Sequence, residues 1–240
     1  MEKKVEVRSF GCSANFGEGE VIQGLLQQQN LQIVENKSDA LVLNLCTVKG
    51  NSSSLTEIRK AQQEDPQRKI IISGCVTKEL AQEALAIDKS ISVTTTHDLD
   101  NMDKIVEQSL AGTPFFNLKK KNTTRVQLPR IRSNQAIGIV PICSGCLDRC
   151  AFCSTVQVKG KLFSYAEEQI IAEVESLVSD GAKEIWLTGQ DAACYGFDTK
   201  TNIVELLQKL VLIPGEFFLR VGMGNPRHMM AYIDDLIAIM

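Results

Sequence analysis

The sequence has no apolar run approaching the ~20 residues that a membrane-spanning helix needs. It has no excess of positive charge either, because 26 Lys and Arg stand against 29 Asp and Glu and give a net charge of −3. The whole chain is therefore not a basic nucleic-acid binder. Its first ten residues, MEKKVEVRSF, lack the apolar core of a signal peptide. We expect a cytoplasmic protein with no membrane contact through this segment.

The chain is, by contrast, rich in cysteine, with eight in 240 residues. Disulfides are rare in a reducing compartment, so eight cysteines indicate metal or cluster ligands more than a disulfide framework. Apolar residues make up 44% and charged residues 23% of the sequence, which is ordinary for a globular protein that buries a core. The length allows two modest domains or one large one.

The first 112 residues alternate short apolar runs with helical patterns. The apolar runs are KVEVRSF, DALVLNL, RKIIISG and SISVTT, and amphipathic segments such as EGEVIQGLLQQQN separate them. Uniformly apolar strands separated by helices indicate a parallel sheet that is covered on both faces. We therefore assign residues 1–112 to an α/β domain with a doubly wound parallel sheet.

Residues 113–132 have no acidic residue, contain two prolines and show weak periodicity. Six basic residues lie in this segment: Lys119, Lys120, Lys121, Arg125, Arg130 and Arg132. One interpretation is a solvated linker, and the other is a basic strip that faces a polyanion. Both interpretations stay open at the level of sequence.

Residues 133–240 contain about three strand–helix units, whose strands are AIGIVPI, KEIWLTG and GEFFLRVG. Three parallel units do not close a barrel, which needs more strands. The region is therefore either a small open sheet or the first part of a larger barrel. The apolar ending LIAIM favours a fragment.

Three widely separated cysteines follow predicted strands of the first domain. Cys12 comes after VEVRSFG, Cys46 ends LVLNL, and Cys75 ends IIISG. Because the carboxyl ends of parallel strands meet at one edge, these thiols can converge. The alternative is three small buried packing residues. Three thiolates without an obvious fourth partner suit an iron–sulfur cluster with one open iron better than a closed zinc site.

A second set of cysteines lies in the stretch CSGCLDRCAFC, from Cys143 to Cys153. Cys146, Cys150 and Cys153 have the spacing C-x₃-C-x₂-C on the loop after a strand, which can ligate three corners of a [4Fe–4S] cluster. Cys143 forms C-x₂-C with Cys146, so a four-cysteine zinc site is an alternative. Cys143 also ends an apolar strand, where it can be a packing residue. We favour three ligands over four.

The C-x₃-C-x₂-C loop, with Phe152 before its last cysteine, resembles the radical S-adenosylmethionine (SAM) superfamily. Further segments along the whole chain resemble sequence motifs of the radical-SAM methylthiotransferases, namely FGCSANFGEGE, NLCTVKGNSSS, ISGC and EIWLTGQDAACYG. Phe16 stands where polar residues are common in that family. The CTVKG form is most similar to the archaeal and eukaryotic branch, which modifies threonylcarbamoyladenosine in tRNA.

The resemblance implies an enzyme that inserts a methylthio group at C2 of N6-threonylcarbamoyladenosine, at position 37 of tRNA. It implies two [4Fe–4S] clusters and SAM as cofactors, and the tRNA anticodon stem-loop and an electron donor as partners. We expect a monomer. The alternatives are a methylthiotransferase acting on isopentenyladenosine in tRNA or on a ribosomal-protein aspartate, or a non-enzymatic zinc or electron-transfer protein.

The same resemblance places Gln190 and Asp191 beside bound SAM, and Arg220 near SAM or a cluster. A polar loop cap and a structural ion pair are the alternatives for these residues. We interpret His97 and His228 as surface or helix-end histidines and Cys194 as a packing residue. Family members continue through further barrel strands to an RNA-binding domain, so we expect a C-terminally truncated chain that is inactive alone.

Overall fold

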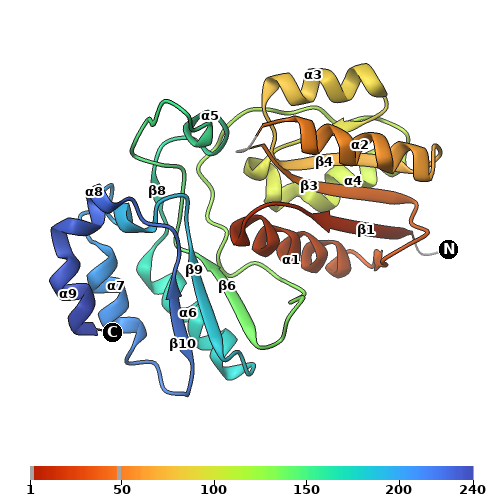
Figure 1. Ribbon diagram of the computed structural model, residues 1–240. Helices are drawn as coiled ribbons and strands as arrows, with labels where there is room; N and C mark the ends of the chain where they lie inside the picture. The colour runs from red at the N-terminus through yellow and green to blue at the C-terminus, as the bar shows by residue number, and fades with distance from the viewer. Residues whose placement is uncertain (1–2, 48–49, 240) are drawn as a thin grey trace. The chain divides into compact units, whose positions relative to one another are not determined.

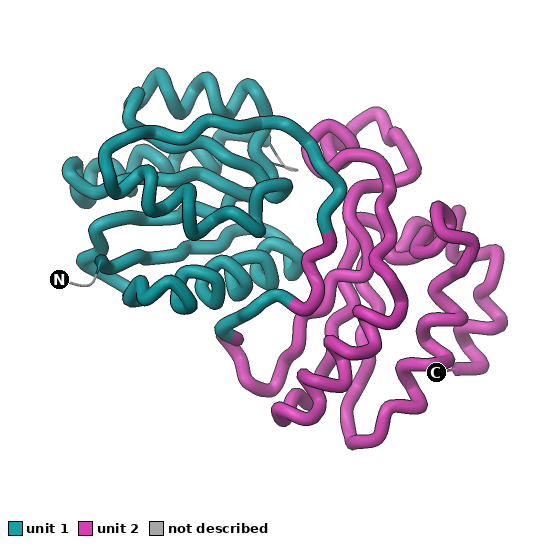
Figure 2. Tube along the Cα trace, turned by 180° about the vertical axis from the view of Figure 1, so that it is seen from behind, with its two compact units in different colours: residues 1–123, 128–131 teal, residues 124–127, 132–240 magenta. Residues whose placement is uncertain are grey.

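The computed structural model describes residues 3–47 and 50–239. The chain forms two compact units (Figure 2): unit 1 comprises residues 1–123 and 128–131, and unit 2 comprises residues 124–127 and 132–240. The phrase CTVKG includes Val48 and Lys49, which lie outside the described residues. None of the described helices is both long and apolar enough to cross a bilayer.

Unit 1 is built on a five-stranded sheet with the order β2-β1-β3-β4-β5, in which every neighbouring pair is parallel. The strands are β1 (Lys4–Ser9), β2 (Gln32–Ile33), β3 (Ala40–Cys46), β4 (Lys69–Cys75) and β5 (Ser92–Val93). The predicted parallel sheet is confirmed, and the two-residue strand β2 is an addition to it. The two central strands, β3 and β4, are almost wholly buried, which is why they read as continuous apolar runs.

Helices cover both faces of this sheet (Figure 1). They are α1 (Ser13–Gln28), α2 (Ser52–Glu64), α3 (Lys78–Ile87) and α4 (Met102–Leu110), with the short helix η1 (Thr96–Asn101) before α4. Successive side chains of a strand point to opposite faces. Leu41 and Leu43 accordingly join the core under α2 and α3, while Val42 joins the core under α1 and α4.

Unit 2 contains an open, three-stranded parallel sheet with the order β10-β9-β6. Its strands are β6 (Ile137–Pro141), β9 (Glu184–Thr188) and β10 (Phe218–Val221). The main helices are α6 (Glu167–Ser179), α7 (Ile203–Leu210) and α9 (Ile233–Ile239), and Ile170, Leu206 and Leu236 pack with Ile185 and Leu187 in one core. This is the strand–helix alternation that the sequence predicts for the beginning of a barrel.

Shorter strands and helices lie within the loops of unit 2. A small antiparallel pair, β7 (Cys143–Ser144) with β8 (Phe163–Ser164), closes the segment that contains the second cysteine set. The helices α5 (Thr155–Lys159) and η2 (Ala192–Cys194) follow the cysteine loop and strand β9, and α8 (Pro226–Met229) and η3 (Met230–Tyr232) follow β10. The site is built from these loops and short helices.

Candidate functional site

The first cysteine set lies at the carboxyl edge of the sheet in unit 1. Cys46 and Cys75 are the last residues of β3 and β4, and they are direct partners in the register of the two strands. Cys12 is the residue before α1, three residues after the end of β1, which is the other neighbour of β3. The strands that end at these thiols are thus adjacent in the middle of the sheet.

Gly11 brings the Cys12 loop close to Cys46. Its φ of +112° is a conformation that side chains rarely adopt, and a Cβ placed there would lie 2.4 Å from Cys46 Cβ and 3.0 Å from Cys46 Sγ. Only glycine fits between the loop and the strand end. The close approach of two cysteine-bearing segments therefore depends on a missing side chain.

Asn15 lies beneath the thiols and was not singled out from the sequence. It is fully buried in the first turn of α1, and its Oδ1 is 3.5 Å from Cys12 Sγ and 3.8 Å from Cys75 Sγ. Its Nδ2 donates to the carbonyl of Leu45, the residue before Cys46. One amide therefore contacts the chain at all three strand ends. No local pattern marked it, because the buried positions of α1 also include Glu18 and Glu20.

The exposure of the thiols leaves this edge accessible from one side. Cys12 is exposed, Cys46 is half-buried and Cys75 is buried. Thr47 donates to the carbonyl of Cys75 at 2.5 Å and fixes the end of β4. The result is a set of three thiols near rigid strand ends, of which Cys12 is the most exposed to solvent.

The start of the second cysteine loop is fixed by its neighbours. Gly145, with φ +77°, approaches so closely that a Cβ would lie 2.1 Å from the carbonyl oxygen of Lys161. The Gly145 N–H donates to Gln190 Oε1 at 2.7 Å, and the Cys146 N–H donates to the carbonyl of Gly160 at 3.3 Å. Cys146 is therefore held in place by the end of β9 and by the segment after α5.

The end of the loop forms a tight turn. The Cys153 N–H donates to the carbonyl of Cys150 at 3.0 Å, and the Cys153 thiol donates to Thr155 Oγ1 at 3.1 Å. Cys150 is exposed, and the ring of Phe152 is 91% exposed. The loop thus presents its three thiols, Cys146, Cys150 and Cys153, from a turn that is open to solvent.

The three thiols of each triad do not lie close together among the described residues. A zinc ion bound at about 2.3 Å holds its sulfur ligands less than about 4 Å apart. Within residues 3–47 and 50–239, neither triad brings its three sulfurs within 4.8 Å of one another.

Cys143 has the environment of a packing residue. It is 2% exposed, and a Cβ on Gly189 would lie 2.7 Å from its Sγ. Burial raises the pKa of its thiol well above the usual value. Its close contact with Gly189 inside the core of unit 2 is what a packing residue shows. The pKa of Cys146 is raised as well, mainly by desolvation, although this thiol is only half-buried.

The three residues expected near SAM occupy different environments. Gln190 reaches the cysteine loop through Gly145. Asp191 is 3% exposed, and its Oδ1 accepts from the N–H groups of Ala193 and Asn225 at 3.2 and 2.9 Å. Arg220 is exposed on β10 and lies over the ring of Trp186, with its guanidinium carbon 4.6 Å from the ring centre.

We expected surface or helix-end histidines, and both lie near helix ends, in η1 and α8, but both are buried. His97 is 2% exposed, and its Nδ1 lies 2.8 Å from the carbonyl of Lys121. His228 is 7% exposed and lies between the carboxylates of Asp148 and Asp191. Their partners are distant in sequence, so no local pattern marks these positions. Cys194 is fully buried, as expected of a packing residue, and burial raises the pKa of its thiol to about 12.

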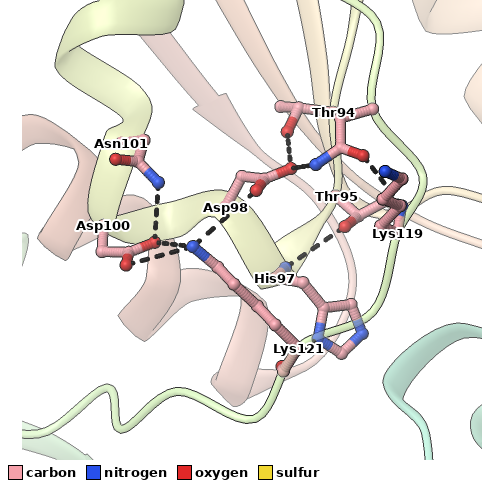
Figure 3. Close-up of polar contacts among 9 residues, drawn as sticks. Thr94, Thr95, His97, Asp98, Asp100, Asn101, Lys119 and Lys121 are labelled. Atoms are coloured by element: carbon pink, nitrogen blue, oxygen red, sulfur yellow. Dashed lines mark hydrogen bonds and ion pairs between the residues drawn. The ribbon is translucent and has the colours of Figure 1, made fainter.

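The basic segment is only partly a solvent-exposed strip. Figure 3 shows Lys121 pairing with Asp100, at 2.8 Å, and reaching Asp98, at 3.8 Å. Arg125 is 5% exposed and donates to Ser144 Oγ, and the side chain of Arg132 is 4% exposed and pairs with Asp180 at 2.5 Å.

Arg125 and Arg132 are therefore structural residues of unit 2, where they do not face a polyanion. Lys119 and Lys120 are the two exposed lysines of the segment. A basic strip in this region would rest mainly on this pair.

Comparison with known proteins places these features in context. Residues 4–95 match the family described as Uncharacterized protein family UPF0004. The chain is 34% identical over 240 residues to the probable threonylcarbamoyladenosine tRNA methylthiotransferase of Pyrococcus horikoshii, covering 98% of this chain and 56% of the relative. It is 35% identical over 250 residues to the human threonylcarbamoyladenosine tRNA methylthiotransferase, covering 99% of this chain and 42% of that protein. The chain thus spans about half the length of the curated relatives it matches.

A solved structure shares the fold. It is the radical S-adenosylmethionine methyltransferase TsrM from Kitasatospora setae, with cobalamin and a [4Fe–4S] cluster bound. The match has a TM-score of 0.58 at 11% identity and covers 100% of this chain and 53% of that chain. At this identity the likeness supports the α/β architecture and carries no further conclusion.

Proposed function

We propose a function from the premise that this chain belongs, by its sequence, to the radical-SAM methylthiotransferases. The protein inserts a methylthio group at C2 of N6-threonylcarbamoyladenosine at position 37 of tRNA. The observation that carries the proposal is the pair of cysteine triads, each on the loops at the carboxyl edge of its own parallel sheet. The relatives described above are named for this nucleoside, which favours it over isopentenyladenosine or a protein aspartate.

Each triad would bind a different cluster. Cys12, Cys46 and Cys75 would hold one [4Fe–4S] cluster, and the loop from Cys146 to Cys153 would hold the other together with SAM. When bound, the second cluster and SAM would supply a 5′-deoxyadenosyl radical, which can take the hydrogen atom from an unactivated C–H bond such as that at C2 of adenine and leave as 5′-deoxyadenosine. The protein's own residues position these groups.

Several residues have positioning roles that follow from their contacts. Asn15 orients the three strand ends in unit 1, and Gln190 fixes the backbone just before Cys146. We propose that Gln190 and Arg220 also contact SAM. Asp191 would support the same edge from within unit 2, because one oxygen of its carboxylate, Oδ1, accepts from two backbone N–H groups.

Nucleoside analysis tests the proposed activity. We expect tRNA from cells that lack the gene to lose the methylthio form of threonylcarbamoyladenosine, measured by mass spectrometry of digested tRNA. The intact gene should restore it, Cys46→Ser and Cys150→Ser should not, and Cys143→Ala should. If the methylthio form of isopentenyladenosine disappeared instead, the substrate assignment would be wrong. An unchanged nucleoside profile would contradict a role in tRNA methylthiolation altogether.

A further inference from the structure

A third group of possible metal ligands lies in unit 2, outside both cysteine triads. Asp191 and Cys194 come from the segment after β9, and His228 comes from α8. Their exposed fractions are 3%, 0% and 7%, and one ligand atom from each lies within 4.8 Å of the other two. Among the residues that the structure describes, no other three His, Cys, Asp or Glu side chains bring their ligand atoms this close together.

Two atoms of this group are buried without hydrogen-bond partners. Asp191 Oδ2 and His228 Nδ1 are 3.2 Å apart, yet neither makes an aligned hydrogen bond to a described residue. The other carboxylate oxygen of Asp191 is already used by two backbone N–H groups. A buried polar atom left unsatisfied costs about 1–3 kcal/mol. A bound ion between them would satisfy both atoms.

A shared ion explains both the distance and the poor alignment. Ligands at about 2.0–2.3 Å from a tetrahedral zinc ion lie about 3.3–3.6 Å from each other. The observed 3.2 Å is close to that range. Ligands of one ion direct their lone pairs at the ion and not at each other, so a short contact without a hydrogen bond is the expected arrangement.

The far side of His228 is arranged as metal-bound histidines require. Its Nε2 faces Asp148 Oδ2 at 3.4 Å, and Asn225 Nδ2 donates to that same oxygen at 2.7 Å. A carboxylate at one ring nitrogen keeps the proton there and leaves the lone pair of the other nitrogen for a metal. Phe197 packs against the imidazole, with ring centres 5.6 Å apart. The ring is thus held from two sides.

We propose that Asp191, Cys194 and His228 bind one zinc-class divalent ion. A mixed oxygen, sulfur and nitrogen set suits zinc, whereas calcium and magnesium take oxygen ligands. Cys194 loses its proton to solvent as the zinc–sulfur bond forms, and a water molecule fills the fourth position. The ion ties the segment after β9 to α8. This inference does not depend on the proposed tRNA activity.

Zinc and iron analysis of the anaerobically reconstituted protein tests the site. After dialysis against dilute Zn²⁺ with a weak chelator, we expect about one zinc per chain in addition to the iron. X-ray absorption at the zinc edge should show one sulfur and about three nitrogen or oxygen ligands. Zinc that had occupied a cysteine triad would show three sulfurs instead, and that result would overturn the proposal.

Variants assign the ligands. Cys194→Ala and His228→Gln should lose the zinc and keep the iron. Cys143→Ala is the matched control, because its buried thiol lies 3.8 Å from the same Asp191 carbonyl that Cys194 contacts at 3.1 Å, yet it stands outside the ligand set. Asp148→Asn should weaken zinc binding about 10- to 100-fold without abolishing it.

The thermal midpoint of unfolding gives an independent readout if a variant binds iron poorly. Added Zn²⁺ should raise the midpoint of the parent and of Cys143→Ala, and should not raise that of Cys194→Ala or His228→Gln. Absence of bound zinc from the parent would overturn the proposal and show that Asp191 and His228 contact each other without an ion. Equal zinc in the parent and in both ligand variants would also overturn the proposal.

Discussion

Asn15 lies beneath the first cysteine triad and shows how one polar side chain can organise a site. Its Oδ1 faces two thiols, its Nδ2 holds the carbonyl before the third cysteine, and its own carbonyl accepts from Asn44 Nδ2 at 2.6 Å. Asn44 is itself a buried polar residue within an apolar strand. The sequence places the cysteines at strand ends, but it does not reveal the amide that joins them.

We expect Asn15→Leu to lower the free energy of unfolding by about 1–3 kcal/mol, because the buried carbonyl of Leu45 loses its donor. Iron bound by the first triad should fall as well. Urea unfolding and iron analysis of the anaerobic protein measure the two effects. Asn36→Leu, at an exposed position, is the control and should change neither. An Asn15→Leu variant with unaltered iron and stability would remove Asn15 from the positioning role.

The second prediction at the residue scale separates Cys143 from Cys150. We expect the reconstituted protein to bind about eight iron atoms in two [4Fe–4S] clusters. Cys150→Ala should remove about half of this iron, because it deletes a ligand of one cluster. Cys143→Ala should keep all of it, because the Cys143 side chain is buried in the core against Gly189. Equal loss of iron in both variants would mean that Cys143 is a fourth ligand.

At the scale of elements, a buried ion-pair network joins β1, α2 and the start of β4. Glu6 pairs with Arg8 at 2.6 Å and with Arg68 at 3.1 Å, and Glu64 pairs with both arginines. The side chains of Glu6 and Arg68 are 6% and 4% exposed. A buried charge is costly without its partner, so the network should fix how α2 sits on the sheet.

Arg68→Met tests this network. We expect a loss of about 3 kcal/mol in the free energy of unfolding, since Glu6 would keep only one of its two partners in a buried position. Arg59→Met, at an exposed position of α2, should change stability by less than about 0.5 kcal/mol. Urea unfolding at neutral pH measures both. Similar values for the two variants would show that the network does not stabilise unit 1.

The same network predicts a pH dependence. The hydrogen bond from Arg8 lowers the pKa of Glu64 in the folded state. A lowered pKa contributes stability that is present above the unfolded value of about 4.3 and is lost as the pH falls through the folded pKa.

Glu64→Gln measures this contribution. At pH 7 the substitution should lower the free energy of unfolding by less than about 1 kcal/mol, because Glu64 is partly exposed. Near pH 3 it should have little effect on stability. A larger effect at pH 3 than at pH 7 would reverse the expected sign.

At the scale of the whole molecule, each unit carries its own cysteine triad at the carboxyl edge of its own parallel sheet. This much was predictable, because apolar runs mark the central strands and the carboxyl ends of parallel strands share one edge. The pairing of Arg132 with Asp180 and the grouping of Asp191, Cys194 and His228 were not predictable. Asp180 lies 48 residues after Arg132, and His228 lies far along the chain from Asp191 and Cys194, so neither periodicity nor local spacing records these contacts.

The exposed lysines of the basic segment are the positions where a tRNA substrate would contact it. Lys119 and Lys120 are exposed, whereas Arg125 and Arg132 are buried and Lys121 pairs with acidic residues of unit 1. Changing Lys119 and Lys120 to Ala should weaken tRNA binding and lower the slope of log K against log salt by about 1.5 to 2 units, because each lost phosphate contact removes a counterion-release contribution.

Binding titrations at several salt concentrations measure the slope, and iron content should stay the same. The matched control changes Arg59 and Lys60 to Ala, which removes the same charge from exposed positions of α2. An equal loss of affinity in the control would show only a general effect of net charge. An unchanged slope in the Lys119 and Lys120 variant would show that the segment is a solvated linker and that tRNA is bound elsewhere.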